Sequence, residues 1–237
     1  MIDRRRRVQN RILRSLPPTE YRRLTARART VRLSGSRVLA DFDRPSLYVY
    51  FPVTGMCGIT LSCRSGARLQ VASVGCEGVT SIYRNYLKTP DAQLHVELQP
   101  ATAVQVSVED FDREMDARLT LQSVVRKFYS ALHAEMMLSV ACNRVHSLRQ
   151  RYCRHLLSLT DRLASNELRI THMSIAALLG ATRPSVTLAS VELKRLGAIS
   201  YRRNTLKILD RTTLEARACE CYWTARGLLE DLLPPRI

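Results

Sequence analysis

The sequence lacks any uninterrupted apolar run of about 20 residues, the length a helix needs to span a bilayer. No apolar segment of the signal-peptide kind follows the arginines at its start, so we expect a cytoplasmic protein. Acidic residues are scarce, because 21 Asp and Glu stand against 37 Lys and Arg, giving a net charge of +16. This excess predicts a polyanionic partner, either nucleic acid or an anionic membrane surface.

Motifs that carry catalysis or bind metals are also missing. There is no glycine loop for phosphate and no G-x-S-x-G motif, so we do not expect an enzyme. The seven cysteines include no C-x-x-C pair. Cys219 and Cys221 lie on a predicted helix, where their thiols would point to different faces. None of the five histidines has the spacing of metal ligands; they are His95, His133, His146, His155 and His172. We therefore predict no metal and no cofactor, and interpret the cysteines as small buried hydrophobes, with a single redox-reactive thiol as the alternative.

Residues 171–209 carry the strongest local signal in the chain. Thr171 suits the N-cap of a short helix, and Gly180 suits the left-handed position after its end. A second helix then opens with Pro184 in its first turn and ends at Gly197. The apolar positions of the two helices are Met173, Ile175, Ala176, Leu178, Leu179, Val186, Ala189, Val191, Leu193 and Leu196. Two short helices joined by a tight glycine turn predict a helix-turn-helix.

A wing is predicted directly after these helices, with strands at 199–201 and 206–209 around a polar turn. In a helix-turn-helix the second helix enters the major groove with its N-terminal residues on base edges. The side chains that this placement would bring to DNA are His172, Arg183, Ser185, Thr187, Leu188, Arg202, Arg203 and Lys207. Arg183 has the planar fork that pairs with guanine, and Leu188 suits a thymine methyl group. The alternative is a helical hairpin packed on a small sheet, without a DNA contact.

Residues 31–107 contain short β-prone runs separated by Gly, Pro and Asp, a pattern that predicts an antiparallel sandwich or roll. The runs lie at 38–39, 47–51, 58–61, 69–72, 94–98 and 103–106, with one short helix expected at 79–86. Residues 109–142 follow as one long helical pattern with an apolar stripe. The stripe comprises Leu121, Val124, Val125, Phe128, Leu132 and Met136, and Val140 continues it. Such a seam predicts a dimer contact, or packing on the β domain of the same chain.

Further helices are predicted at both ends of the chain. Two short ones precede the β domain, the second capped by Thr19, and two longer ones cover 145–163 and 213–233. The many arginines of residues 1–32 are interpreted as a solvated face on helices that cover the β domain. They are not interleaved with the aromatic residues that insert into membranes. A contact with DNA or with a membrane surface is the alternative.

Five stretches, in this order, resemble the Crp/Fnr family of bacterial transcription regulators. They are 47–55 (LYVYFPVTG), 74–79 (VGCEGV), 141–157, 171–209 and 218–222 (ACECY). The resemblance implies an α+β fold with an N-terminal antiparallel β-roll of the double-stranded β-helix or jelly-roll type. The effector domain would cover residues 1–108 with its N-terminal helices, and a dimerisation helix 109–142. A winged helix-turn-helix domain with a C-terminal helix would cover 143–237.

The resemblance also implies the partners of the chain. These are a second copy of the chain, palindromic double-stranded DNA read by two helices about 34 Å apart, and RNA polymerase. By the family pattern Arg183 would read a base, while Thr171 and Thr182 would contact phosphates. Pro184 and Leu188 depart from that pattern, so the consensus DNA site of the family is not expected here.

Family members that bind cyclic AMP hold its phosphate with an arginine–serine pair. The matching positions carry Ala92 and Gln93, with the carboxylate of Asp91 beside them, which would repel a phosphate. Gly75 and Glu77 preserve part of the other end of this pocket. We therefore expect a degenerate effector pocket around Gly75, Glu77, Ala92 and Gln93, no dependence on a cyclic nucleotide, and an unknown effector.

Taken together, the residues favour a sequence-specific regulator that acts as a homodimer. Two alternatives stay open at this point. One is a module that binds an effector or a protein and has only non-specific affinity for DNA. The other is attachment to an anionic membrane surface through residues 1–32. Preferential binding to one DNA sequence would distinguish a sequence-specific regulator from both alternatives.

Overall fold

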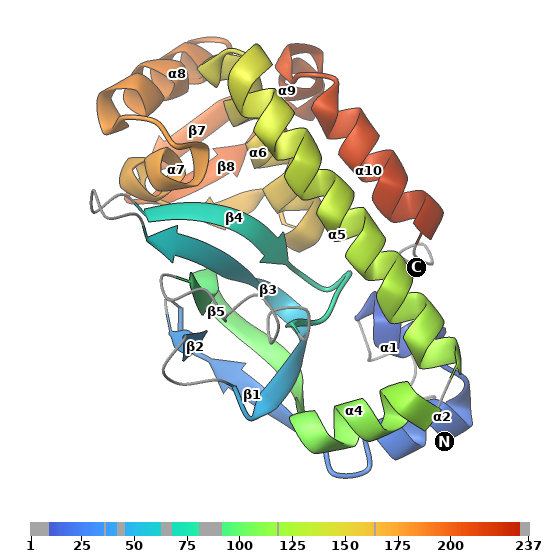
Figure 1. The fold of residues 1–237 in the computed structure, drawn as a ribbon. Helices are drawn as coiled ribbons and strands as arrows, with labels where there is room; N and C mark the ends of the chain where they lie inside the picture. The colour runs from blue at the N-terminus through green and yellow to red at the C-terminus, as the bar shows by residue number, and fades with distance from the viewer. Residues whose placement is uncertain are drawn as a thin grey trace.

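The computed structural model describes residues 10–35, 37–41, 46–62, 68–80, 92–117, 119–163 and 165–232. Figure 1 shows a curled sheet at one end, helices with a small sheet at the other, and the long helix α5 (Leu119–Val145) running along both. The predicted α+β fold, with an antiparallel β-roll, a long helix and a winged helix-turn-helix, is confirmed. Within the described ranges, no helix combines the length and apolar character that crossing a membrane requires.

The N-terminal sheet consists of five antiparallel strands. They are β1 (Arg29–Leu33), β2 (Val38–Asp41), β3 (Tyr48–Ser62), β4 (Arg68–Val74) and β5 (Ala92–Ser107). Their order is β1-β5-β3-β4, with β2 also paired to β5. β3 and β5 each replace two predicted short strands, and the expected break in β3 is instead a pair of register shifts between Pro52 and Met56. Gly55, at φ 72°, lies within this irregularity. The predicted helix at 79–86 falls mostly outside the described residues.

Two short helices, α1 (Arg11–Ser15) and α2 (Pro18–Leu24), pack against the roll. Ile12, Leu13 and Leu24 are buried in the same core as the strands, which confirms that these helices cover the β domain. Asn10 caps α1, and its Nδ2 donates to the carbonyls of Pro52 at 3.0 Å and Gly78 at 2.8 Å. The prediction that Thr19 caps the second helix is wrong, because α2 already begins at Pro18.

The prediction of a single helix over residues 109–142 is wrong. Two helices occupy this stretch, α4 (Val108–Ala117) and α5, and they run in different directions (Figure 1). Four side chains of the predicted dimer stripe are buried in the core of their own chain, namely Leu121, Val125, Phe128 and Leu132. They are therefore not exposed on the surface of the single chain, where a dimer contact would form. Val124 and Met136 are partly buried against the same core.

The C-terminal half has its own core. It contains α6 (Leu148–Leu163), β6 (Glu167–Arg169), α7 (His172–Leu179), α8 (Arg183–Arg195), β7 (Ile199–Arg202) and β8 (Thr205–Ile208). The strands form an antiparallel sheet in the order β6-β8-β7. The wing strands β7 and β8 confirm the prediction, while β6 was not predicted because only Leu168 of its three residues is buried.

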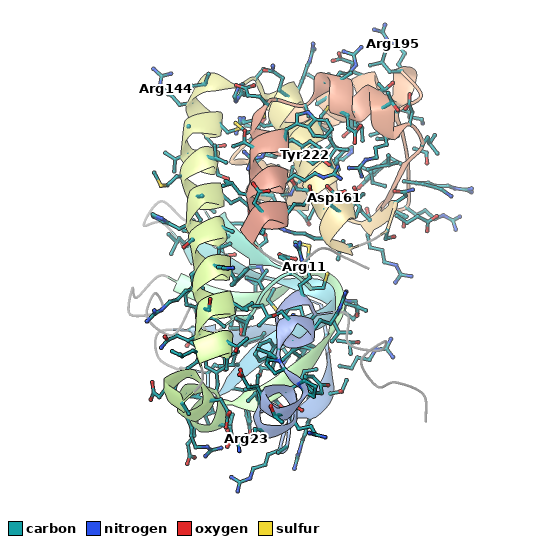
Figure 2. All side chains as sticks on the ribbon, turned by 90° about the vertical axis from the view of Figure 1, so that its right-hand side faces the viewer. Arg11, Arg23, Arg144, Asp161, Arg195 and Tyr222 are labelled. Atoms are coloured by element: carbon teal, nitrogen blue, oxygen red, sulfur yellow. The ribbon has the colours of Figure 1, made fainter. Side chains whose placement is uncertain are left out.

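The last predicted helix, 213–233, is two helices, α9 (Arg211–Arg217) and α10 (Cys221–Leu232). α10 lies alongside α5 and α6 (Figure 1). The Tyr222 hydroxyl donates to Asp161 of α6 at 2.7 Å, and the two side chains face one another in Figure 2. Cys219 lies in the break between α9 and α10 and Cys221 at the start of α10. The two thiols therefore do not lie on different faces of one helix, contrary to the sequence prediction.

Candidate nucleic-acid interface

The two helices of the helix-turn-helix begin and end as their sequence predicts. The Thr171 hydroxyl accepts from the Ser174 amide at 3.0 Å, and Gly180 ends α7 in the left-handed conformation at φ 58°. Thr182 caps α8 by accepting from the Ser185 amide at 3.4 Å. Each cap satisfies one backbone N–H that has no partner inside its helix. Local chemistry therefore fixes the start of α8, where base-reading residues are expected.

The outer face of α8 is more apolar than its sequence suggested. Val186, Ala189 and Leu193 are buried as predicted. Val191, by contrast, is 59% exposed, and Leu188 is 70% exposed on the same side. Met173 of α7 and Leu196 are also exposed, so their assignment to buried faces is wrong. A hydrophobic residue at helical spacing marks a face, but it does not show what covers that face.

Positive charge surrounds this face. Arg183 at the start of α8, Arg195 at its end, and Arg202 and Arg203 in the wing are all exposed. Figure 2 shows Arg195 pointing outward from the molecule. Among the described residues, no acidic side chain forms an ion pair with Arg183, Arg202 or Arg203. Lys207 does pair with Glu167, at 3.2 Å, but both side chains are exposed, and such pairs hold weakly.

His172 is turned into the protein. Its Nδ1 lies 3.0 Å from the Thr187 hydroxyl, which itself donates to the Arg183 carbonyl, and its ring stacks on Tyr201 at 4.4 Å. Its Nε2 is enclosed and has no hydrogen-bond partner among the described residues. Burial, helped by the Arg183 charge, lowers the pKa of His172 and favours the neutral ring. The expectation that His172 meets a phosphate is therefore corrected: it connects α7, α8 and the wing.

The tip of the wing is a two-residue turn. Arg202 pairs with Thr205 across the hairpin, and the intervening Arg203 and Asn204 have φ values of 47° and 64°. Positive φ at both central positions defines a type I′ turn, whose twist matches that of the flanking strands. The turn places Arg203 at the tip in a conformation that arginine rarely adopts.

Gly75 and Glu77 follow the end of β4, and Ala92 and Gln93 begin β5, with β3 between the two strands. Glu77 is 2% exposed, accepts from the Gly75 amide at 2.8 Å and pairs with Arg162 of α6 at 3.2 Å. Gln93 lies opposite Thr60 on one side of β3, whereas Val74, next to Gly75, lies opposite Cys57 on the other. Three residues of strand correspond to about 10 Å. Asp91 and the side chain of Ala92 are outside the described residues.

Arg162 is a residue that the sequence did not single out. It carries the contact between Glu77 of the roll and Glu135 of α5, with which it also pairs. Its partners lie far away in the sequence and in different elements, so no local pattern could have pointed to it. The interface between the roll and the helix-turn-helix half thus contains a buried charge network.

Comparisons with known proteins agree with this architecture. Residues 150–217 match the model of the Crp-like helix-turn-helix domain. A Crp/Fnr family putative transcriptional regulator from Eubacterium rectale has a TM-score of 0.67 at 16% identity, over 88% of this chain and 98% of that one. FixK2 from Bradyrhizobium japonicum has a TM-score of 0.67 at 16% identity, over 81% and 98% of the two chains. No curated protein sequence matches significantly. The resemblance to the Crp/Fnr family is confirmed: the chain carries a Crp-like helix-turn-helix domain on the fold of these regulators.

Proposed function

We propose that this protein is a sequence-specific DNA-binding transcription regulator. It acts as a homodimer on a palindromic site and does not depend on a cyclic nucleotide. The observation that carries the proposal is the capped helix α8, which presents Arg183 and Leu188 to solvent beside a wing that carries Arg202 and Arg203. The net charge of +16 supports an electrostatic attraction to DNA over the whole chain.

The exposed side chains of α8 suggest how a base sequence is read. Arg183, at the first position of the helix, reads guanine through paired hydrogen bonds. Leu188 and Val191 form an apolar strip that suits thymine methyl groups. The hydroxyls of Thr171 and Thr182, at the two caps, contact phosphates, and the wing arginines follow the backbone. Thr187 and His172 position α8 rather than touch DNA, since they bond to one another.

The solvent-facing side of α5 supplies the dimer surface in this proposal. Met137 is 61% and Val140 73% exposed, and Ala141 lies beside them. The N-terminal half of the same face carries Arg126, Lys127 and Ser130 instead, which are exposed and polar. An apolar contact near the C-terminal end of α5 would bring the two-fold axis close to the DNA-binding halves. This placement suits two recognition helices set one helical turn of DNA apart.

Two features support independence from cyclic nucleotides: the contacts of the Glu77 carboxylate and the residues at the start of β5. One oxygen of the Glu77 carboxylate, Oε1, is already bound by the Gly75 amide and the Arg162 guanidinium. Ala92 and Gln93 offer no cation for a cyclic phosphate, which needs charge-assisted hydrogen bonds. The input that controls the protein is therefore a different one.

Replacing Arg183 with alanine should weaken binding to the preferred duplex by roughly 1–3 kcal/mol, or about 5- to 150-fold, and relax one base position. Arg202→Ala and Arg203→Ala should instead weaken all duplexes evenly and reduce the salt slope by about one each. The measurement is fluorescence anisotropy with a palindromic duplex selected from a random pool, at fixed salt, with and without cyclic AMP.

Arg226→Ala is the matched control, because it removes an arginine from α10, far along the chain from α8. It should change the affinity for the preferred duplex less than twofold. A pool without any preferred sequence would favour the alternative of an effector- or protein-binding module whose DNA affinity comes from charge alone. DNA binding that requires cyclic AMP would contradict the inference that Ala92 and Gln93 cannot hold a cyclic phosphate.

A further inference from the structure

Four potential metal ligands from two distant segments meet at the C-terminal end of α5. The sulfurs of Cys142, Cys219 and Cys221 and a ring nitrogen of His146 all lie within 4.8 Å of one another. We propose that these four residues form a structural zinc site of the Cys3His type. The site joins the end of α5 to the turn between α9 and α10. It was not expected from the sequence, which predicted no metal.

The separations suit one tetrahedral ion. Zinc binds thiolate sulfur at about 2.3 Å and imidazole nitrogen at about 2.0–2.1 Å, so neighbouring ligand atoms lie about 3.5–3.8 Å apart. Cys142 Sγ is 3.5 Å from Cys219 Sγ, and Cys221 Sγ is 3.7 Å from His146 Nδ1. The widest separation, 4.8 Å, closes with shifts of about an ångström in side chains alone.

The local backbone explains why the ligands converge. His146 follows Cys142 by four residues, and its amide donates to the Cys142 carbonyl at 3.0 Å, so both side chains share one face of the helical turn. Cys219 lies in the break between α9 and α10, and Cys221 is the first residue of α10. The irregular backbone there turns both thiols to the same side, which an unbroken helix would not do.

A neighbouring carboxylate orients the histidine. His146 Nε2 lies 3.0 Å from Glu220 Oε1. When Nε2–H donates to Glu220, the lone pair of Nδ1 is left facing Cys221. Histidines that bind metals commonly donate their other ring N–H to a carboxylate in this way. This contact is independent of the thiol cluster and fixes the tautomer that a metal requires.

The donor set selects the ion. Three thiolates and an imidazole, with no carboxylate among the four ligands, suit zinc and disfavour magnesium, calcium and manganese. All three cysteines are buried, and four protein ligands complete a tetrahedron, so no position is left for a reacting water.

A disulfide between Cys142 and Cys219 is the rival explanation for the close thiols. It would need the two sulfurs at about 2.05 Å, and it would use only two of the four residues. The third cysteine, the inward nitrogen of His146 and the contact with Glu220 would then have no role. The metal site accounts for all of them.

The test uses the full chain, purified in a non-thiol reductant and freed of metal, and titrates it anaerobically with Co²⁺ and then Zn²⁺. We expect one equivalent of Co²⁺ to give the visible bands of a tetrahedral thiolate complex, and Zn²⁺ to displace it. Zinc should also raise the melting temperature, because it binds only the folded chain tightly. Cys221→Ser should lower the zinc affinity at least 100-fold.

Cys76→Ser is the matched control, since Cys76 is a thiol outside the cluster, and it should bind zinc like the wild type. Glu220→Ala and Glu220→Gln provide a second test on a side chain that is 77% exposed. The alanine should cost about 10- to 100-fold in affinity, and the glutamine, which keeps a carbonyl acceptor, should restore part of it. Failure of the wild type to bind one equivalent of Co²⁺ or Zn²⁺ in the titration would overturn the site. Equal losses in Cys76→Ser and Cys221→Ser, or a Cys142–Cys219 disulfide that persists in the presence of the reductant, would also overturn it.

Discussion

Replacing Arg162 with alanine should lower the free energy of unfolding by about 3–5 kcal/mol. Arg162 is nearly buried, and it pairs with Glu77 of the roll and Glu135 of α5. Removing the guanidinium leaves two carboxylates close together and away from water, and one Glu77 oxygen already has no hydrogen-bond partner among the described residues. Urea unfolding followed by circular dichroism at neutral pH would measure the loss.

Two variants calibrate that result. Arg226→Ala breaks an exposed ion pair with Glu230, four residues away on α10, and should cost no more than about 0.5 kcal/mol. Arg162→Met combined with Glu77→Gln removes both charges of the buried pair and should recover much of the loss, because no carboxylate is then stranded at position 77. A cost for Arg162→Ala as small as that for Arg226→Ala would show that the network is hydrated and not a structural link.

Introducing aspartate at both Met137 and Val140 should convert a dimer into monomers. The two-fold axis would bring four new carboxylates together in the apolar part of the α5 surface, where like charges cost several kcal/mol. We expect the dimer dissociation constant to rise by on the order of 100-fold or more. Sedimentation velocity over a range of concentrations would measure it.

Ser123→Asp with Ser130→Asp is the matched control on the same helix. These serines are exposed in its polar half, where Arg126 and Lys127 are close along the helix and would accommodate a carboxylate. The control should therefore leave the association nearly unchanged. A wild-type chain that stays monomeric, or a dimer that tolerates the Met137 and Val140 changes, would contradict the dimer surface proposed for α5.

The features that the sequence predicts well are those set by neighbours in the chain. Thr171, Gly180 and Thr182 act within a few residues of themselves, so the helix-turn-helix could be placed to within about a residue. The wing hairpin follows for the same reason, since its turn lies between two short apolar strands. The sequence also predicts an antiparallel roll, but Pro52 and Gly55, which separate two of its predicted strands, are irregularities inside β3.

The features that the sequence missed depend on which surfaces meet. The apolar stripe of α5 is real, but periodicity cannot tell whether Phe128 faces its own roll or a partner chain. The sequence places Val191 in the core because helical spacing shows which face of the helix a residue occupies, but not whether anything packs against that face. The thiol cluster needed both the break after α9 and the approach of α10 to α5. Its Cys142 and Cys219 are 77 residues apart, beyond any local pattern.

The anchoring of α1 has a consequence for the order in which the chain folds. The Arg11 guanidinium donates to the Leu229 carbonyl at 3.0 Å, across 218 residues of sequence, and lies beside the lower end of α10 in Figure 2. Ribosomes add about 5–20 residues per second, so α1 waits roughly 10–40 s for this partner. During synthesis the first helix and the roll must persist without their last contact. The final packing of the N-terminal segment is therefore a late, post-translational step, and contacts of such long range slow folding.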